Sequence, residues 1–386
     1  MLSKSRYRED IRVRREAEAL SAAGHVITVM SVDDTEFAEA GILVRGIGPV
    51  GGLQPRLWEP PRSIPFRALR WLLLPEHRHR ALRQFHRRAI EMARRLDSSF
   101  DVVHAHDLPA LRAGADLADL WDAALVYDAH EYWPGVPRHG RPEPIRRFKR
   151  DRQAGVAARR ADLVITVSLG AAKLLRERYG LRNIAVVRNT FPPRYDLQAP
   201  PHPRGAVYAG RIGPGRDLET VVSADIWKTI GLELHLMGPV DISYVLEGDF
   251  ELHPIGTIDE VDQLLTVMGI ALVPLSKGPI NHEIALPNKL FQAIAAGVPA
   301  VCADLPEIAK LVRSTGVGVV YTPGDPTSLL NALETIVAEY RRFVDAVRVA
   351  REELNWANDA ARLVSAYRAL AHRRLRGLRM EIPRSG

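Results

Sequence analysis

The 386-residue sequence contains a single cysteine, Cys302, and no long hydrophobic run. A lone cysteine excludes a disulfide framework within the chain and any metal site built only from cysteines. The apolar runs are far shorter than the ~18 residues that a membrane-spanning helix needs. The residues Met1–Arg6 contain no apolar segment of the kind found in a secretory signal peptide. These absences predict a cytoplasmic protein.

Motifs for nucleic-acid binding are also missing, because no zinc-finger spacing, RNP-like aromatic motif or heptad-linked basic region occurs. What is present is an uneven charge. The net charge is +7, but residues 1–200 carry 34 Lys/Arg against 24 Asp/Glu, whereas residues 201–370 carry 14 against 21. The basic half should attract polyanions, and an anionic membrane is a better candidate than nucleic acid.

The length predicts two domains, and the composition, 46% hydrophobic and 26% charged, is that of a globular protein. Short β-branched runs alternate with helical segments, which predicts βαβ units in doubly wound parallel sheets. The expected strands are 26–30, 101–104, 124–127, 163–167, 184–187, 206–209, 233–237, 270–274, 300–303 and 318–321. The expected helices are 12–23, 77–96, 171–179, 288–296 and 326–339.

A proline-rich stretch, Pro192–Pro203, lies where the charge balance changes sign, and it is the expected linker. We therefore predict one Rossmann-like domain over residues 1–195 and a second over 204–352. Two such domains facing each other would bind their ligand in the central cleft, at the carboxyl ends of the strands.

The beginning of the first domain is unusual, because a doubly wound domain normally has a strand before its first helix. Only residues 1–10 precede the helix expected over 12–23. We predict that this first strand is missing. Either translation starts further upstream or the domain has an unusual edge.

The first motif with chemical meaning runs from Tyr208 to Asp217, between a strand and a helix. Its glycines, Gly210 and Gly213 among them, would let the backbone approach a ligand, and a helix N-terminus offers free N–H groups to an anion. Arg211 and Arg216 flank the loop, and guanidinium groups suit phosphate oxygens. The alternative interpretation is a Gly/Pro turn with solvated arginines.

The second motif, residues 281–301, predicts a polar loop, a helix that begins near Pro287, a glycine stop and a strand. Polar residues gather at or near the start of this helix: His282, Glu283, Asn288, Lys289 and Gln292. A capped and exposed helix start is the alternative to a binding site.

Together these motifs resemble those of family 4 glycosyltransferases, which have the GT-B fold. The family pattern is Gly-Arg, a Lys five positions later, and then Glu-Ala-x-Ala-x-Gly-x-Pro-Val. Here Gly210-Arg211 is followed by Arg216, and Gln292 opens the later motif. In the first half, residues 10–13, 103–107 and 127–131 are similar to an Asp-Pro-Arg-Val opening and to two strand-end motifs of the family. The resemblance extends from about Asp10 to Tyr367.

The resemblance implies transfer of a sugar from a nucleotide-diphosphate sugar to an acceptor, with retention of configuration. It implies catalytic roles for His130, Arg211, Arg216 and Glu283. The substrate-binding residues that we expect are Gly210, Gly213, Asn189, Gly238, Leu286, Asn288, Lys289, Gln292, His106 and Asp107. It also implies that residues 353–386 comprise a helix that crosses back to the first domain, followed by a basic tail. His104 we interpret as structural.

Two departures from the family pattern concern its pair of glutamates eight positions apart. The second falls at Gln292, which is uncharged, and the first falls at Ile284, beside Glu283. No Asp-x-Asp pair, the metal–nucleotide motif of the other large glycosyltransferase fold, occurs in the sequence. Because arginines take the charge-neutralising role, we expect no metal dependence and no cofactor.

The segment Arg62–Arg95 holds ten Arg against two Glu, with aromatic and leucine residues between them. Leu82, Phe85, Ala89 and Ala93 form a core stripe at helical spacing. Two interpretations of the remaining residues of this segment stay open. They bind the inner face of an anionic membrane beside a lipid-linked acceptor, or they form a solvated charged face. Two other functions stay open: a catalytically silent GT-B binding protein, and a nucleotide-sugar epimerase.

Overall fold

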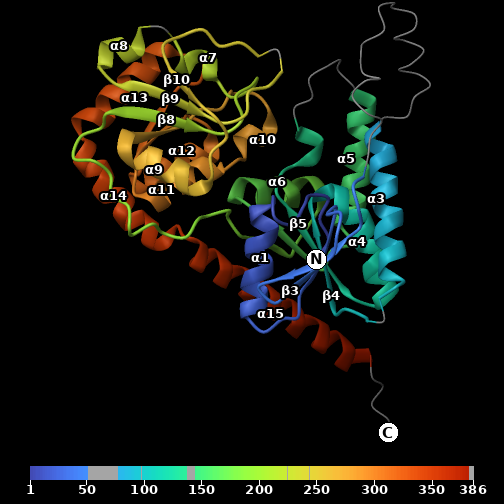
Figure 1. Cartoon of the computed structure of the whole chain (residues 1–386). Helices are drawn as coiled ribbons and strands as arrows, with labels where there is room; N and C mark the ends of the chain where they lie inside the picture. Colours follow the sequence, from blue (N-terminus) through green and yellow to red (C-terminus); the bar gives the residue numbers. More distant parts are fainter. Residues whose placement is uncertain (51–76, 97, 137–143, 224, 243, 382–386) are drawn as a thin grey trace, which may run out of the picture.

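The computed structural model describes residues 1–50, 77–96, 98–136, 144–223, 225–242 and 244–381. They form two α/β units, with the N-terminal unit in blue and green and the C-terminal unit in yellow and orange (Figure 1). A long helix, α15 (Trp356–Glu381), leaves the C-terminal unit and runs back along the N-terminal one (Figure 1).

The N-terminal unit contains two sets of strands. A three-stranded sheet has the order β1-β3-β2, and a four-stranded parallel sheet has the order β4-β5-β6-β7. All of the pairs are parallel except β2 with β3. The strands are β1 (Thr28–Ser31), β2 (Phe37–Glu39), β3 (Ile42–Gly46), β4 (Val102–His106), β5 (Ala124–Ala129), β6 (Leu163–Thr166) and β7 (Ile184–Val186).

Residues 1–3 join these two sheets. Leu2 bridges Met30 of β1 on one side and Ala105 of β4 on the other, both in parallel. The Leu2 amide donates to His104 O at 2.7 Å, and the His106 amide donates to Leu2 O at 3.0 Å. The place of the expected first strand is therefore taken by one bridging residue, and no full strand precedes α1 (Ile11–Ala22) among the described residues.

The helices of the N-terminal unit begin and pack for local reasons. Asp10 caps α1, since its carboxylate accepts from the Val13 amide at 3.2 Å. Of the stripe predicted from the sequence, Phe85, Ala89 and Ala93 lie buried in the core, whereas Leu82 is only half-buried. The other helices are α3 (His77–Ala93), α4 (Asp107–Trp121), η2 (Trp133–Gly135), α5 (Pro144–Ala158) and α6 (Leu169–Tyr179).

The C-terminal unit is one six-stranded parallel sheet, of order β10-β9-β8-β11-β12-β13. Its central strands are buried on both faces, as continuous apolar runs require. The strands are β8 (Gly205–Ala209), β9 (Glu233–Met237), β10 (Glu251–His253), β11 (Gly269–Val273), β12 (Ala300–Ala303) and β13 (Gly318–Tyr321). The helices are α7 (Leu218–Val221), α8 (Ile226–Ile230), α9 (Ile258–Met268), α10 (Ile280–Glu283), α11 (Asn288–Ala296), α12 (Pro306–Thr315), α13 (Pro326–Ala338) and α14 (Tyr340–Glu353).

Helix α15 belongs to the core of the N-terminal unit. Leu363, Tyr367 and Leu370 are buried there together with residues of α1 and β3. The ion pair of Arg188 with Asp359, at 3.4 Å, ties the start of α15 to the segment after β7. The two units are therefore connected twice, by the linker and by this helix.

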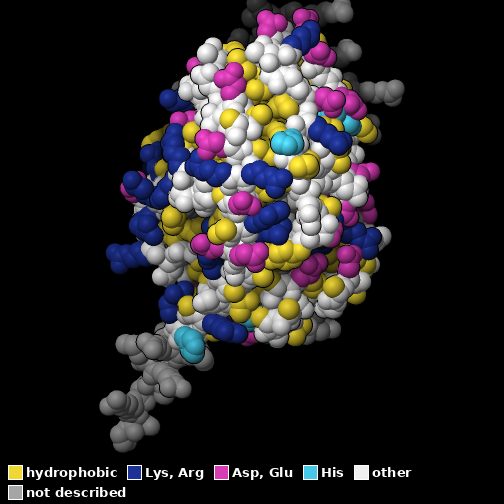
Figure 2. Space-filling model, turned by 90° about the vertical axis from the view of Figure 1, so that its left-hand side faces the viewer, with side chains coloured by type: hydrophobic (Ala, Val, Ile, Leu, Met, Phe, Trp, Pro, Cys, Tyr) yellow, Lys and Arg dark blue, Asp and Glu magenta, His cyan; other side chains and the backbone are white. Residues whose placement is uncertain are grey.

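The surface has two features that bear on membrane contact. No helix among the described residues is long and apolar enough to span a bilayer. Lys and Arg side chains gather on one side of the face in Figure 2 and mix with acidic ones elsewhere. Much of the predicted membrane segment Arg62–Arg95, up to residue 76, lies outside the described residues.

Candidate active site

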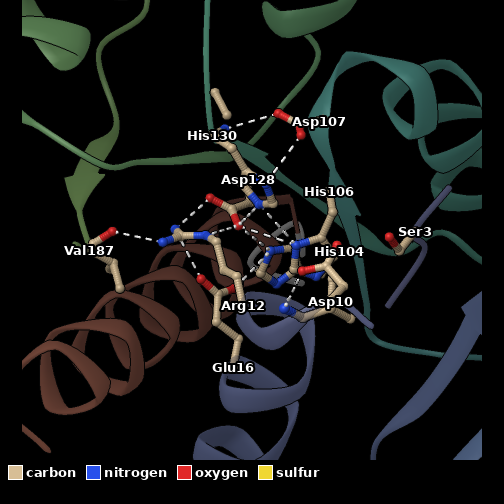
Figure 3. A network of polar contacts seen from close by, with 12 residues as sticks. Ser3, Asp10, Arg12, Glu16, His104, His106, Asp107, Asp128, His130 and Val187 are labelled. Atoms are coloured by element: carbon tan, nitrogen blue, oxygen red, sulfur yellow. Dashed lines mark hydrogen bonds and ion pairs between the residues drawn. The ribbon is translucent and has the colours of Figure 1, made fainter. Parts of the chain in front are cut away.

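Polar side chains gather where β4 and β5 end in the N-terminal unit. His104 and His106 belong to β4, and Asp128 belongs to β5, where it is paired in register with His106. Asp107 begins α4, and His130 follows β5 directly. Because parallel neighbouring strands end at one edge of the sheet, these residues come together there (Figure 3).

Asp128 is the centre of this cluster and is fully buried. Arg12 of α1 donates to both of its oxygens at 2.8 Å, and His130 Nε2 and His106 Nδ1 lie 2.8 and 3.2 Å from Oδ2. Burial alone would raise the pKa of Asp128, but Arg12 and His130 hold that pKa well below its usual range. Asp128 is therefore an ionised carboxylate that orients three cationic or dipolar groups.

His130 is held between two carboxylates. Its Nδ1 lies 3.1 Å from Asp107 Oδ2, and its Nε2 faces Asp128. Its backbone N–H also donates to Asp107 Oδ1 at 3.0 Å. Burial would lower the pKa of His130, yet Asp107 and Asp128 raise it well above its usual value. At neutral pH the ring is therefore a fixed imidazolium, and its side chain is 22% exposed.

The same cluster extends to the crossing helix. His104 Nδ1 lies 2.7 Å from the Tyr367 hydroxyl, and its Nε2 lies 3.5 Å from Glu16 Oε2. Burial, together with His106, puts the pKa of His104 well below its usual value. His104 is thus a neutral, enclosed side chain that packs β4 against α1 and α15, which agrees with a structural role.

Glu16 is a second buried carboxylate beside Arg12, in addition to Asp128. Burial raises its pKa to about 8, against the opposing effect of Arg12 at 3.0 Å. Glu16, His104, His106 and Asp128 offer ligand atoms close enough to hold a metal ion. Arg12 already supplies the positive charge at this place, so a cation would meet electrostatic repulsion there.

In the C-terminal unit, the loop between β8 and α7 is shaped by two glycines. Gly210 has φ +146°, and a Cβ on it would lie 2.7 Å from both Cε and Nζ of Lys289. Gly238, at the end of β9, has φ +142° and packs against Gly210 O so closely that a Cβ would clash. A side chain at position 210 or 238 would therefore clash, and the two glycines let the Gly210 backbone lie directly against Lys289 and the end of β9.

Arg216 and Lys289 are the two cations beside this loop. Burial, and then the charge of Arg216, lower the pKa of Lys289 to about 7. The Lys289 ammonium lies 4.9 Å from the ring centre of Tyr208. Throughout the described ranges, no carboxylate forms an ion pair with either cation. Two neighbouring cations without a counter-charge produce a positive potential that attracts anions.

Arg211, by contrast, is engaged. Its Nε donates to Asp241 Oδ1 at 2.7 Å, and Nη2 contacts the other oxygen of the same carboxylate. Asp241 also covers Gly213, where a Cβ would clash with the carboxylate. Of the two arginines predicted from the sequence, Arg216 is therefore the one with its charge available.

Residues around α10 and α11 fall into two groups. Asn288 Oδ1 accepts from Asn189 Nδ2 at 2.9 Å, which brings two predicted binding residues together across the units. Glu283 accepts from the Gly278 amide at 3.3 Å, and Leu286 is half-buried at the start of α11. Gln292 instead donates to Asp262 Oδ1 at 2.9 Å and faces α9. The amide group of Gln292 is thus engaged by α9.

Helix α10 touches the N-terminal unit directly. Asn281 Oδ1 accepts from the Tyr132 amide at 3.0 Å, and Ser168 Oγ donates to Ile284 O at 2.6 Å. Helix α10 and the residue after it therefore contact the N-terminal unit at Tyr132, which follows His130 closely in the sequence, and at Ser168.

The sequence reasoning did not single out Arg12, Glu16, Asp128 or Asp241. Arg12 and Asp128 lie in the segments 10–13 and 127–131 that resemble family motifs, but nothing in either segment predicts that they meet. Their partnership joins positions 116 residues apart, which only the fold reveals.

Two family models match the chain, one in each unit. Residues 11–194 match the family model described as Glycosyltransferase Family 4, and residues 206–339 match the one described as Glycosyl transferases group 1. A D-inositol 3-phosphate glycosyltransferase of Xylanimonas cellulosilytica is 25% identical over 330 residues, which are 73% of this chain and 75% of that protein.

Solved structures share the architecture. Sucrose-phosphate synthase from Thermosynechococcus elongatus superposes with a TM-score of 0.72 at 18% identity, covering 94% of each chain. HepE of Anabaena, solved in complex with UDP, gives a TM-score of 0.65 at 16% identity and covers 95% of this chain and 99% of that one. These likenesses establish the fold, which is GT-B, with two Rossmann-like units.

Proposed function

The chain belongs to glycosyltransferase family 4, and we propose that it transfers a sugar from a nucleotide-diphosphate sugar to an acceptor with retention of configuration. The observation that carries this proposal is the pair of unneutralised cations, Arg216 and Lys289, beside the Gly210 loop. HepE of Anabaena has been solved with UDP-glucose, and the D-inositol 3-phosphate glycosyltransferase is a relative in sequence, which supports this donor class.

The proposed roles follow from the charges. As the glycosidic bond to the donor phosphate breaks, negative charge develops on the leaving diphosphate. Arg216 and Lys289 would stabilise that charge, with the amides of the Gly210 loop adding N–H donors. His130, held as an imidazolium by Asp107 and Asp128, would bind the donor sugar or its phosphate from the opposite unit. His106, behind it, would position that ring.

In this proposal the remaining predicted residues bind or position substrate. Asn189 and Asn288 would lie at the junction of the two units, and Glu283 would lie near the sugar. Arg211 would fix the Gly213 turn through Asp241. The acceptor, which we expect to be a cell-surface glycan, a glycolipid or a metabolite, would enter beside Asp107. His106, predicted from the sequence to bind substrate, is 3% exposed, so it would act through His130 and not touch the acceptor.

A transfer assay tests the proposal. The protein is incubated with UDP-, GDP-, ADP- and TDP-sugars, and release of the nucleoside diphosphate is measured without acceptor and with candidate acceptors. One donor should be consumed, and the anomeric configuration of the product, read by NMR, should match that of the donor. The competing hypothesis is a catalytically silent binding protein, and the observation that supports it is the contact of Gln292 with Asp262. Such a protein would give no donor turnover.

We expect the rate of transfer to be the same with and without added Mg²⁺ or Mn²⁺. Metal ions serve in such reactions to neutralise a diphosphate, and Arg216 and Lys289 would already do so. A rate measured in metal-free buffer and again with each ion checks this expectation. A rate that rises steeply with either ion would show that the two cations do not suffice.

Anion affinity should depend on pH through Lys289. Only the charged form of Lys289 binds the anion, and the pKa of Lys289 is about 7 in the free protein. The affinity for the anion is therefore greatest below pH 7 and falls as the pH rises through that value. The fall approaches tenfold per unit above about pH 7. Calorimetry measures the affinity for pyrophosphate at each pH, for the wild type and for Lys289→Arg. Comparing the two proteins cancels the effect of the protonation of pyrophosphate itself.

The variant serves as the matched control, because an arginine stays charged over this whole range. The affinity of the wild type divided by that of the Lys289→Arg variant should therefore fall as the pH rises. A constant ratio would mean that Lys289 keeps its proton or does not touch the anion.

A further inference from the structure

A second cluster of ligand-type side chains lies at the edge of the C-terminal sheet. Glu251 of β10 is paired in register with His235 of β9. Glu233 and His253 lie two residues away from these along their own strands, so all four side chains lie on one face of the sheet. This cluster has no part in the transfer reaction proposed above.

The distances within the cluster are those of a metal site. His235 Nδ1 lies 2.9 Å from His253 Nε2, and the two oxygens of Glu251 lie 3.6 and 3.5 Å from these nitrogens. With metal–ligand bonds of about 2.0–2.1 Å, a tetrahedral ion separates its ligand atoms by about 3.3 Å. One ligand atom from each of the three side chains lies within 4.8 Å of the other two, so small side-chain shifts would bring them to one face of such a tetrahedron.

The outer contact of His235 has the form that metal-bound histidines need. Its other nitrogen, Nε2, lies 3.3 Å from a carboxylate oxygen of Glu233. A proton on Nε2 leaves the lone pair of Nδ1 directed at His253 and Glu251, which is the tautomer that binds a metal. His235 is 3% exposed, so its ring is fixed in this orientation.

We propose that His235, His253 and Glu251 bind a divalent transition metal, Zn²⁺, with Glu233 positioning His235. Two imidazoles and one carboxylate are a ligand set that suits Zn²⁺, with water completing the tetrahedron. The ion fastens β10, a three-residue strand that pairs only with β9 among the described strands. It thereby holds together the two strands that the segment carrying Asp241, the partner of Arg211, connects.

The test uses the full-length protein without an affinity tag, treated with chelator and then desalted. Titration with ZnCl₂ in a calorimeter should give one ion per chain, and Co²⁺ in its place should give the intense visible absorption of a tetrahedral site. Zn²⁺ should also raise the melting temperature of the wild type. An absence of binding, or a Co²⁺ spectrum of octahedral type, would overturn the proposal.

Variants assign the ligands. His253→Ala and Glu251→Gln should each weaken Zn²⁺ binding by about 100-fold or more, and Glu233→Gln by roughly 10-fold, since it acts through His235. Glu251 is exposed, so its variant should fold as the wild type does. His202→Ala and Glu247→Gln, at exposed positions outside the cluster, are the controls and should bind as the wild type does. Unchanged affinity in His253→Ala and Glu251→Gln would refute the site.

Discussion

Replacing Arg216 by alanine is expected to lower the kcat of sugar transfer by about 10²–10³-fold, the cost of one preorganised charge at a developing anion. Arg216 is not tied up by any carboxylate in the part of the chain that the structure describes, so its charge is available to the diphosphate. The loss should appear in initial rates at saturating donor.

The chain offers a graded set of controls for this prediction. Arg216→Lys keeps a cation where the family pattern has Lys, so it should retain much more activity than Arg216→Ala. Arg211→Ala should cost less, since Arg211 acts through Asp241. Arg313→Ala removes an exposed arginine of α12 that pairs with Asp304, and the rate should not change. Full activity in Arg216→Ala would remove Arg216 from the reaction.

Replacing Asp128 by asparagine should lower the free energy of unfolding by about 3–5 kcal/mol, because it leaves the buried Arg12 guanidinium without an ionised partner. Glu16, the other carboxylate beside Arg12, has a pKa raised to about 8 by burial and is mostly protonated at neutral pH. Both side chains are nearly or fully buried, and the two hydrogen bonds between them are 2.8 Å long. Asparagine keeps the shape of the side chain, so the loss reports the charge. Urea unfolding at neutral pH measures it.

The pH dependence gives this prediction a second readout. The pKa of Asp128 is held low in the folded protein, so its contribution is present above the unfolded carboxyl pKa and is lost as the pH falls through the folded value. The stabilities of wild type and variant should therefore converge in acid. Asp34→Asn, at an exposed pair with Arg6, is the control and should change stability by less than about 1 kcal/mol. A loss that small in Asp128→Asn would contradict the account.

Most of the strands could be predicted from sequence because they are apolar on both faces, as in Ala124–Ala129. The exceptions are β2, β3 and β10, which the sequence reasoning did not predict. β2 and β10 are three-residue edge strands, and they carry no such signal. The first strand was expected to be missing, and one bridging residue, Leu2, takes its place.

Residues of the candidate site could be predicted only where a short segment carries a recognisable local pattern. Gly210, Arg216 and Lys289 stood out because glycines and cations next to helix starts suggest an anion site. The network around Asp128 was not predicted, because its members come from α1, β4, β5 and α15, and only the fold brings them together. The contacts of Arg211 with Asp241 and of Gln292 with Asp262 are likewise long-range.

The central claim is that Arg216 and Lys289 form the donor phosphate site, and nucleotide binding tests it most directly. Calorimetric titration with UDP, GDP, ADP and TDP should reveal one nucleoside diphosphate that binds the wild type. Arg216→Ala should bind it about 10–100-fold more weakly, as expected for a lost hydrogen bond to a charged group. Equal affinity in the variant, or no binding of any of the four by the folded wild type, would contradict the account.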